Sequence, residues 1–199
     1  MSAVLLTRLK ITDLAAWTAL EAGRRLLPPE HALIRLAREE LYLFEPAEGF
    51  AAEAFEGPLE RAIESSNFFV NPNKEAYRFL TSSEKGAALR PPEGAQGILA
   101  RPRDDTRDGE LWTRLEREHP LEGLGAIRRA RLWWIWTRGP GGGPAFEACY
   151  AALGRVTGRA SGLLVNPHAE ADLAFGNSVP WRRVEEFLTH PAPGLEDAA

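Results

Sequence analysis

The chain lacks several features that would each point to a familiar class of protein. Its 199 residues include one cysteine, Cys149, which cannot form an internal disulfide and is typical of a reducing compartment. The four histidines are isolated, without the spacing of a zinc or iron site. No apolar run is long enough to span a bilayer. With 24 Lys and Arg against 28 Asp and Glu, there is no basic footprint for nucleic acid. The sequence therefore predicts a cytoplasmic protein without a metal, membrane or nucleic-acid partner.

Recognisable catalytic arrangements are absent as well. Cys149 falls on the presumed face of a helix, which predicts a buried thiol rather than a nucleophile. The glycine-rich run 139–144 contains two prolines, which lack N–H donors, and no Lys-Ser or Lys-Thr follows it, so a flexible connection is expected rather than a phosphate loop. We therefore predict no catalytic residues and no cofactor.

What the chain does contain is an internal repeat. Three motifs recur in the same order at an offset of 93 to 95 residues. They are Trp-Thr-x-Leu-Glu at 17–21 and 112–116, Ile-Arg-x-Ala-Arg at 34–38 and 127–131, and Val-Asn-Pro-x-x-Glu-Ala at 70–76 and 165–171. This period is too long for the usual solenoid repeats. Each copy is therefore predicted to be a small domain, and the chain a covalent pseudo-dimer.

Each copy is predicted to be a two-layer α+β sandwich of the ferredoxin-like kind, with two helices on one face of an antiparallel sheet. The predicted domains are 1–82 and 95–177, with a linker at 83–94 and a C-terminal helix and tail at 178–199. The expected elements of the first copy are strands at 4–11, 32–45 and 76–80 and helices at 13–27 and 51–67. Those of the second copy are strands at 97–101, 126–137 and 171–175 and helices at 109–118 and 145–161.

Two irregularities are expected in the first copy. The apolar residues of 32–45 change parity near 37–40, which predicts a bulge, a bend or a tight turn between two strand segments. The pair Gly57-Pro58 is expected to interrupt the second helix, with its regular part beginning at Pro58. Pro28-Pro29 is expected to stop the first helix, and 191–199 to form a frayed tail.

Several repeated residues have a structural and a functional interpretation. The pairs Asn71-Pro72 and Asn166-Pro167 are predicted to stop helices, because Asn tolerates the left-handed conformation and Pro cannot continue a helix. Trp17 and Trp112 are predicted to be core residues, with ligand stacking as the alternative. The repeated arginines either border the sheet in solvent or line a groove that meets a phosphate or a partner's carboxylates. These arginines are Arg35, Arg38, Arg128 and Arg131.

The repeated pattern resembles the PurS protein, the small subunit of phosphoribosylformylglycinamidine synthase. The resemblance rests on the Ile-Arg-x-Ala-Arg segments at 34–38 and 127–131 and on the segments 68–78 and 163–171 around the two Asn-Pro pairs. It implies a non-catalytic protein that bridges the glutaminase and synthetase subunits of a purine-pathway complex and assembles through its sheets. The tandem chain resembles two such units side by side.

Alternatives remain open for arrangement and function. The apolar strand 132–136 predicts that the halves share a continuous sheet or a hydrophobic sheet face, and a mobile linker between separate units is the alternative. The second functional hypothesis is an anion-binding or enzymatic sandwich whose cleft lies between the copies, with the four arginines as anchors. A homodimer is expected. The apolar stripe of the expected helix 180–188 covers either its own unit or a neighbouring chain.

Overall fold

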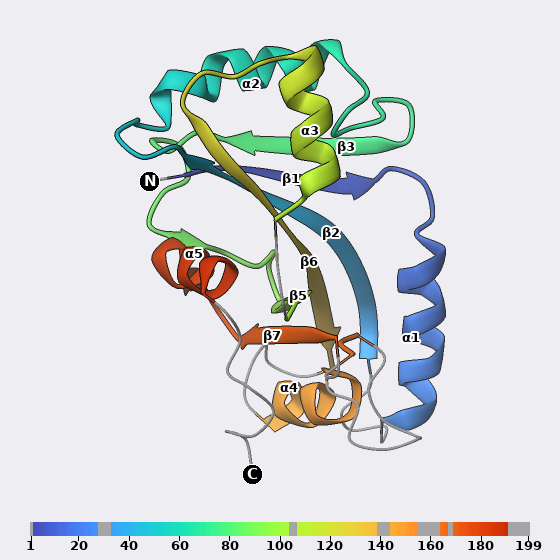
Figure 1. The fold of residues 1–199 in the computed structure, drawn as a ribbon. Helices are drawn as coiled ribbons and strands as arrows, with labels where there is room; N and C mark the ends of the chain where they lie inside the picture. The colour runs from blue at the N-terminus through green and yellow to red at the C-terminus, as the bar shows by residue number, and fades with distance from the viewer. Residues whose placement is uncertain are drawn as a thin grey trace.

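The structure is a computed structural model, and it describes residues 2–27, 33–103, 107–138, 144–154, 164–166 and 169–190. Its main feature is one six-stranded antiparallel sheet in the order β3-β1-β2-β6-β5-β7 (Figure 1). The strands are β1 (Ala3–Leu9), β2 (Leu33–Pro46), β3 (Glu75–Leu80), β5 (Gln96–Pro102), β6 (Leu124–Thr137) and β7 (Glu170–Phe175). The protein is therefore α+β with an open antiparallel sheet, as the sequence predicted.

The two halves meet at the centre of the sheet. The 14-residue strands β2 and β6 pair along nearly their whole length, from Arg35 opposite Trp136 to Glu45 opposite Ala126. Each half contributes three strands, and the order of one half mirrors that of the other about the β2–β6 pair. The expectation of a continuous sheet is thus met. Trp133 and Trp134 are both buried within it, at 4% and 2% exposure.

Four helices cover one face of the sheet, which we call the helix face and which carries Leu5, Leu36, Phe44, Ile127 and Ile135. The helices are α1 (Leu14–Leu26), α2 (Glu53–Ser65), α3 (Gly109–Glu118) and α4 (Pro144–Cys149), the last continued by a π-helical turn at Tyr150–Gly154. They share cores in mixed pairs, α1 with α4 and α2 with α3, so each pair takes one helix from each half (Figure 1). Because each core needs a helix from both halves, neither half can bury its apolar side chains fully without the other.

The opposite face of the sheet, which we call the α5 face, carries Val4, Leu41, Leu43, Leu132 and Trp134. The helix α5 (Trp181–Thr189) packs on it through Trp181, Val184 and Leu188, which are 4%, 0% and 1% exposed. The apolar stripe expected at 180–188 therefore covers its own chain. No helix within the described residues is long and apolar enough to cross a membrane.

Two expected irregularities are wrong, and each has a physical reason. β2 keeps one register from Arg35 to Glu45, without a bulge near 37–40. Its apolar residues change from one face of the strand to the other because both faces of the sheet are buried. Leu36 faces α1 and α4, while Leu41 and Leu43 face α5. Pro58 lies inside α2 rather than starting it. It is the sixth of the 13 residues of α2, where its missing N–H donor removes one helical hydrogen bond, and the helix continues through it. Pro28-Pro29, the glycine-rich run 139–144 up to Gly143, residues 155–161 and the tail 191–199 lie outside the described residues.

The segment expected to be a linker is packed against the body of the protein. It contains β4 (Ala88–Leu89), which pairs with β8 (Val179–Pro180) just before α5. Lys85 and Leu89 are 6% and 2% exposed. The segment therefore belongs to the α5 layer and does not hang between two separate bodies.

Trypsin is expected to cleave after Lys85 only at the rate of global unfolding, because the lysine side chain is buried and must be released before the protease can bind it. The check is the rate of cleavage at this bond, followed by mass spectrometry, with and without a sub-denaturing concentration of urea. Rapid cleavage in the absence of urea that leaves two stable halves would contradict the packing described here.

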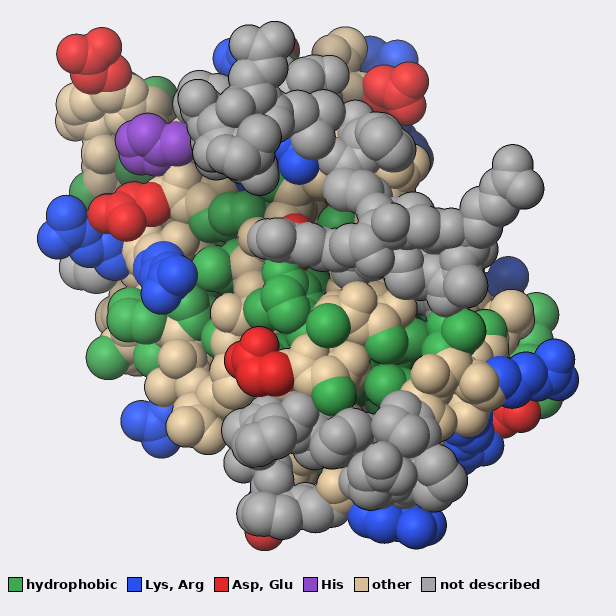
Figure 2. Space-filling view, turned by 90° about the horizontal axis from the view of Figure 1, so that it is seen from below, with side chains coloured by type: hydrophobic (Ala, Val, Ile, Leu, Met, Phe, Trp, Pro, Cys, Tyr) green, Lys and Arg blue, Asp and Glu red, His purple; other side chains and the backbone are tan. Residues whose placement is uncertain are grey.

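Figure 2 shows the molecule from below the view of Figure 1, with hydrophobic side chains gathered in its middle beside an acidic side chain and most other charged side chains toward its margins.

Candidate functional site

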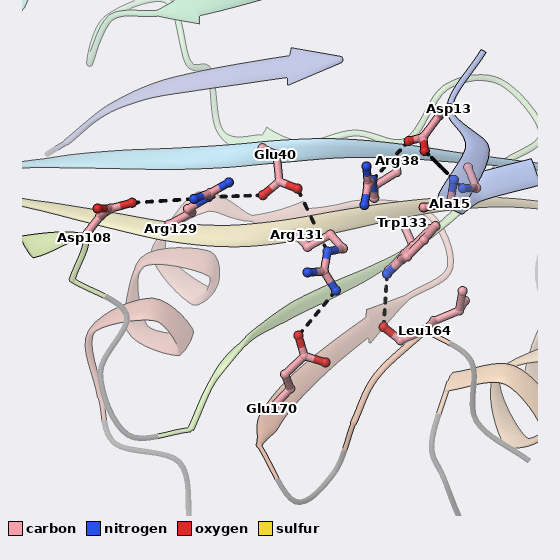
Figure 3. A network of polar contacts seen from close by, with 11 residues as sticks. Asp13, Ala15, Arg38, Glu40, Asp108, Arg129, Arg131, Trp133, Leu164 and Glu170 are labelled. Atoms are coloured by element: carbon pink, nitrogen blue, oxygen red, sulfur yellow. Dashed lines mark hydrogen bonds and ion pairs between the residues drawn. The ribbon is translucent and has the colours of Figure 1, made fainter. Parts of the chain in front are cut away.

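A row of charged side chains crosses the middle of the helix face, between the two helix pairs (Figure 3). Arg129 lies 3.7 Å from Asp108 and 3.3 Å from Glu40. Arg131 lies 4.0 Å from Glu40 and 3.4 Å from Glu170, and its Nε atom has no hydrogen-bond partner. Glu40 and Arg131 stand opposite each other in the β2–β6 ladder. The signs alternate along the row, so each charge is compensated by its neighbours.

The aspartate that caps the first helix of each half pairs with an arginine of the long strand. Asp13 accepts hydrogen bonds from the N–H groups of Ala15 and Ala16, and its other carboxylate oxygen accepts one from Arg38 at 3.0 Å. Asp108 caps α3 in the same way and pairs with Arg129. Each arginine also lies over an aromatic ring of the partner strand, Arg38 over Trp133 and Arg129 over Tyr42.

By these contacts, Arg129 is the counterpart of Arg38 in the second half, whereas the sequence motif gave Arg131 as its counterpart. The reason is the register of the β2–β6 ladder, which shifts at both ends and leaves Ile34 and Gly125 without an opposite residue. The two residues without an opposite residue take the same place in their strands, one in each half. Matching them assigns to each residue of β2 a counterpart in β6 that lies two positions earlier than the one given by the sequence motif. In this correspondence Glu40 matches Arg131.

The charged row has little capacity to bind an anion. With Asp13 and Arg38 included, it contains three guanidinium groups and four carboxylates. Burial raises the pKa of the Tyr42 hydroxyl, although the nearby Arg129 guanidinium lowers it, so this hydroxyl remains protonated at neutral pH. The arrangement positions the helices on the sheet and supplies no free positive charge.

The four arginines singled out in the sequence do not form one cluster. Arg38 and Arg131 lie on the helix face, while Arg35 and Arg128 have the parity of the α5 face. Arg128 pairs with Glu45, and Arg35 lies over the Trp136 ring at 4.5 Å. Of the four, only Arg35 and Arg38 line the groove described below.

The repeated tryptophans differ in burial. Trp17 is 57% exposed, so its predicted place in the core is wrong. Its helix presents Ala16 and Ala19 to the sheet, because small residues allow α1 to approach closely, and Trp17 lies off that side. Trp112 is half-buried and packs against the core beneath α2 and α3.

The Asn-Pro motifs close turns ahead of the edge strands and do not stop helices. The α2 helix ends at Ser65, well before Asn71. The carboxylate of Glu75 accepts a hydrogen bond from the Asn71 N–H at 2.7 Å, and the Asn71 carbonyl accepts one from the Glu75 N–H. No described residue other than glycine has a positive φ, so the left-handed stop is not used. Asn166 and Glu170 repeat both contacts. Pro72 is exposed within the first turn, and Pro167 lies outside the described residues.

A groove lies in the first half, beside the part of β2 that extends beyond the end of β1. The last β1–β2 pair is Thr7 with Glu40, so the residues of β2 from Leu33 to Glu39 have no strand partner on that side within the described chain. Two adjoining cavities of about 460 and 690 Å³ lie here. They form one groove because they share five lining residues, Arg8, Glu39, Ala76, Pro92 and Trp134.

The groove is positively charged although the chain carries a formal charge of −4. Its acidic side chains are Asp13 and Glu39, and both are engaged, Asp13 by Arg38 and Glu39 by the Trp134 Nε1–H at 2.9 Å. Its six basic side chains are Arg8, Lys10, Arg35, Arg38, Arg78 and Arg90. The lining therefore has an excess of four positive charges.

Comparisons of the chain with models of protein families, with curated proteins and with solved structures find no match.

Sequence reasoning missed Arg8, Arg78 and Arg90. The sequence feature that indicates such residues is an arginine inside or just after an apolar strand segment, as at Arg8 in β1 and Arg78 in β3. Only the β1–β3 pairing, in which Leu6 faces Arg78 and Arg8 faces Ala76, brings the two arginines to the same sheet face as diagonal neighbours. Arg90 joins them from the segment after β4.

No group of three or more His, Cys, Asp or Glu side chains in the described part of the chain is placed to hold a metal ion. His119 packs edge-on against Phe68, and His190 follows the last turn of α5. His31 and His168 lie outside the described residues.

Cys149 is expected to resist alkylation in the native protein. It is fully buried at the end of α4, and burial raises the pKa of its thiol to about 12, so almost no thiolate forms at pH 8. Incubation with iodoacetamide at pH 8, followed by intact-mass measurement, should show modification only after addition of denaturant. Modification of the folded protein at the rate of a free thiol would contradict this burial.

Proposed function

We propose that the chain is a non-catalytic interaction subunit made of two fused PurS-like units. The observation that carries this proposal is the repeated turn at both outer edges of the sheet. Asn71 and Glu75 hold the turn before β3 by the same two hydrogen bonds with which Asn166 and Glu170 hold the turn before β7. The mirrored strand order and the two Asp–Arg cap pairs support the same duplication.

In this proposal the protein acts as the PurS component of phosphoribosylformylglycinamidine synthase, joining the glutaminase and synthetase subunits. Among the described residues, the edge strands β3 and β7 each pair with a strand on one side only, which supports a homodimer as the assembled form. The sequence resemblance supports the partner class.

The test is purification of the full chain, tagged, from its native host at endogenous expression level, with mass spectrometry of the proteins that accompany it. Enrichment of a glutaminase and a synthetase of the purine pathway is expected, together with purine dependence of a strain that lacks the gene. In the comparison variant Glu75 and Glu170 are both changed to Ala, which removes the side-chain acceptor of each edge turn and should lower the recovery of both subunits. A deletion strain that grows without purine and retains an intact synthase would reject the role.

The second candidate function is binding of a small anionic molecule. The excess of four positive charges in the groove favours it, because the charge of the whole chain has the opposite sign. Thermal-shift measurement with phosphate, pyrophosphate and citrate tests this class, and a rise in melting temperature is expected.

A further inference from the structure

The groove contains three guanidinium groups that are free to meet a ligand. The side chains of Arg8, Arg78 and Arg90 are exposed and form no hydrogen bond or ion pair with the described residues. Arg8 and Arg78 are diagonal neighbours on adjacent strands, and Arg90 lines the same cavity. Guanidinium groups bind phosphate through paired N–H donors, so three that converge on one cavity match a phosphate chain better than a single charge.

The other end of the groove is aromatic. Trp17 and Trp136 line the larger cavity alone, while Trp134 lines both cavities but is only 2% exposed. Trp17, in the first turn of α1, is 57% exposed, and an exposed indole is a side chain on which a planar ring can stack. The volumes of about 460 and 690 Å³ suit a small molecule rather than a protein segment.

At the matching place in the second half, the described residues hold a buried arginine instead of an exposed one. Arg101 there corresponds to Arg8, since the residues two positions later, Arg103 and Lys10, bond to the turns before β7 and β3 in the same way. Arg101 is 3% exposed, donates to the His190 carbonyl and packs against the Phe187 ring of α5. One copy of the site is thus closed by α5 and the other is open and basic. The fold alone therefore does not require free arginines at this position.

We propose that this groove binds a nucleotide, with its phosphates on Arg8, Arg78 and Arg90 and its base against the tryptophan end. The inference rests on the second proposed function, anion binding, and adds the class of ligand and the residues that hold it. It does not depend on the interaction role.

Isothermal titration of the full chain with ATP, AMP, adenosine and pyrophosphate tests the proposal. ATP is expected to bind more tightly than pyrophosphate, because the base adds stacking, and more tightly than AMP, because it has more phosphates. Arg8→Gln, Arg78→Gln and Arg90→Gln should each weaken ATP about tenfold or more. Trp17→Ala should weaken ATP several-fold and leave pyrophosphate unchanged. The matched control is Arg61→Gln, an exposed arginine of α2 on the helix face, which should bind ATP like the unaltered chain.

The possible failures are separable. Pyrophosphate binding as tight as that of ATP, with no effect of Trp17→Ala, would reject the nucleotide and leave anion binding standing. Binding that the three arginine variants do not weaken would reject this groove as the site. No binding of any probe at millimolar concentration would reject both the nucleotide and the anion-binding function. Circular dichroism of each variant verifies that loss of binding is not loss of folding.

Discussion

Changing Glu40 to arginine is expected to lower the free energy of unfolding by roughly 2–4 kcal/mol. Glu40 lies between Arg129 and Arg131, 3.3 and 4.0 Å from their Nε atoms, near the centre of the β2–β6 ladder. The substitution removes two attractions and places three guanidinium groups together. The Glu40 side chain is 25% exposed, so solvent screening keeps the cost below that of a fully buried charge. Urea denaturation measures the change.

The exchanged pair Glu40→Arg with Arg131→Glu should recover much of this loss. The matched residues Glu40 and Arg131 face one another in the ladder, so the exchange restores an opposite-charge pair at the same place. Recovery is incomplete because the carboxylate introduced in place of Arg131 would lie close to Glu170, which loses its arginine partner. A double variant no more stable than Glu40→Arg alone would show that the pair does not interact across the ladder. Two identical units would place the same side chain, and therefore like charges, at both of these positions. A fused chain whose copies have diverged can place opposite charges there, which is a physical advantage of fusion.

Changing Lys85 to methionine is expected to destabilise the protein by about 2–4 kcal/mol, less than the full cost of removing one partner of a buried ion pair, because the Glu185 side chain that remains is 26% exposed. The Lys85 ammonium donates to the Ser2 carbonyl at 2.8 Å and to Glu185 at 2.5 Å, and it lies 5.6 Å from the Trp181 ring. Its side chain is 3% exposed. This one residue ties the N-terminus, the segment before β4 and α5 together. Thermal and urea unfolding measure the loss.

The matched control is the double variant Lys85→Met with Glu185→Leu. Removing both groups leaves no unpaired buried charge, although the buried Ser2 carbonyl and hydroxyl lose their partners, so its stability should lie above that of the single variant and below that of the unaltered chain. If the single and double variants are equally unstable, packing of the lysine stem rather than the ion pair accounts for the cost.

The ion pair between Lys85 and Glu185 also makes the stability of the protein depend on pH. Burial acts to raise the pKa of Glu185, but hydrogen bonds from Lys85 and Ser2 outweigh it and hold that pKa below its usual value. A carboxyl group with a lowered pKa in the folded state stabilises the protein above its unfolded-state pKa of about 4.5 and loses that contribution as the pH falls. Unfolding measured between pH 6 and pH 3 should therefore show a smaller decline for Glu185→Gln than for the unaltered chain. Equal declines would reject the linkage.

Local patterns predicted most of the secondary structure. The helices expected at 13–27 and 109–118 are α1 at Leu14–Leu26 and α3 at Gly109–Glu118, and the helix expected at 180–188 is α5 at Trp181–Thr189. These features depend on neighbours in the sequence, which a pattern records directly. The parity change in β2 was misread because a pattern shows that residues are apolar but not which layer covers each face. Trp17 was misplaced for a related reason, since a helix can bury its alanines and expose its tryptophan.

By itself, the sequence determined that the chain is α+β with an antiparallel sheet and that its long strands are apolar enough to be buried. Only the tertiary structure decided how the halves combine. The register of β2 on β6 matches Arg38 with Arg129, the helices pair across the halves, and α5 covers one end of the sheet while the groove at Arg8 stays open. These outcomes depend on contacts between residues far apart in the chain, where packing and charge pairing select one register among several that the local pattern allows.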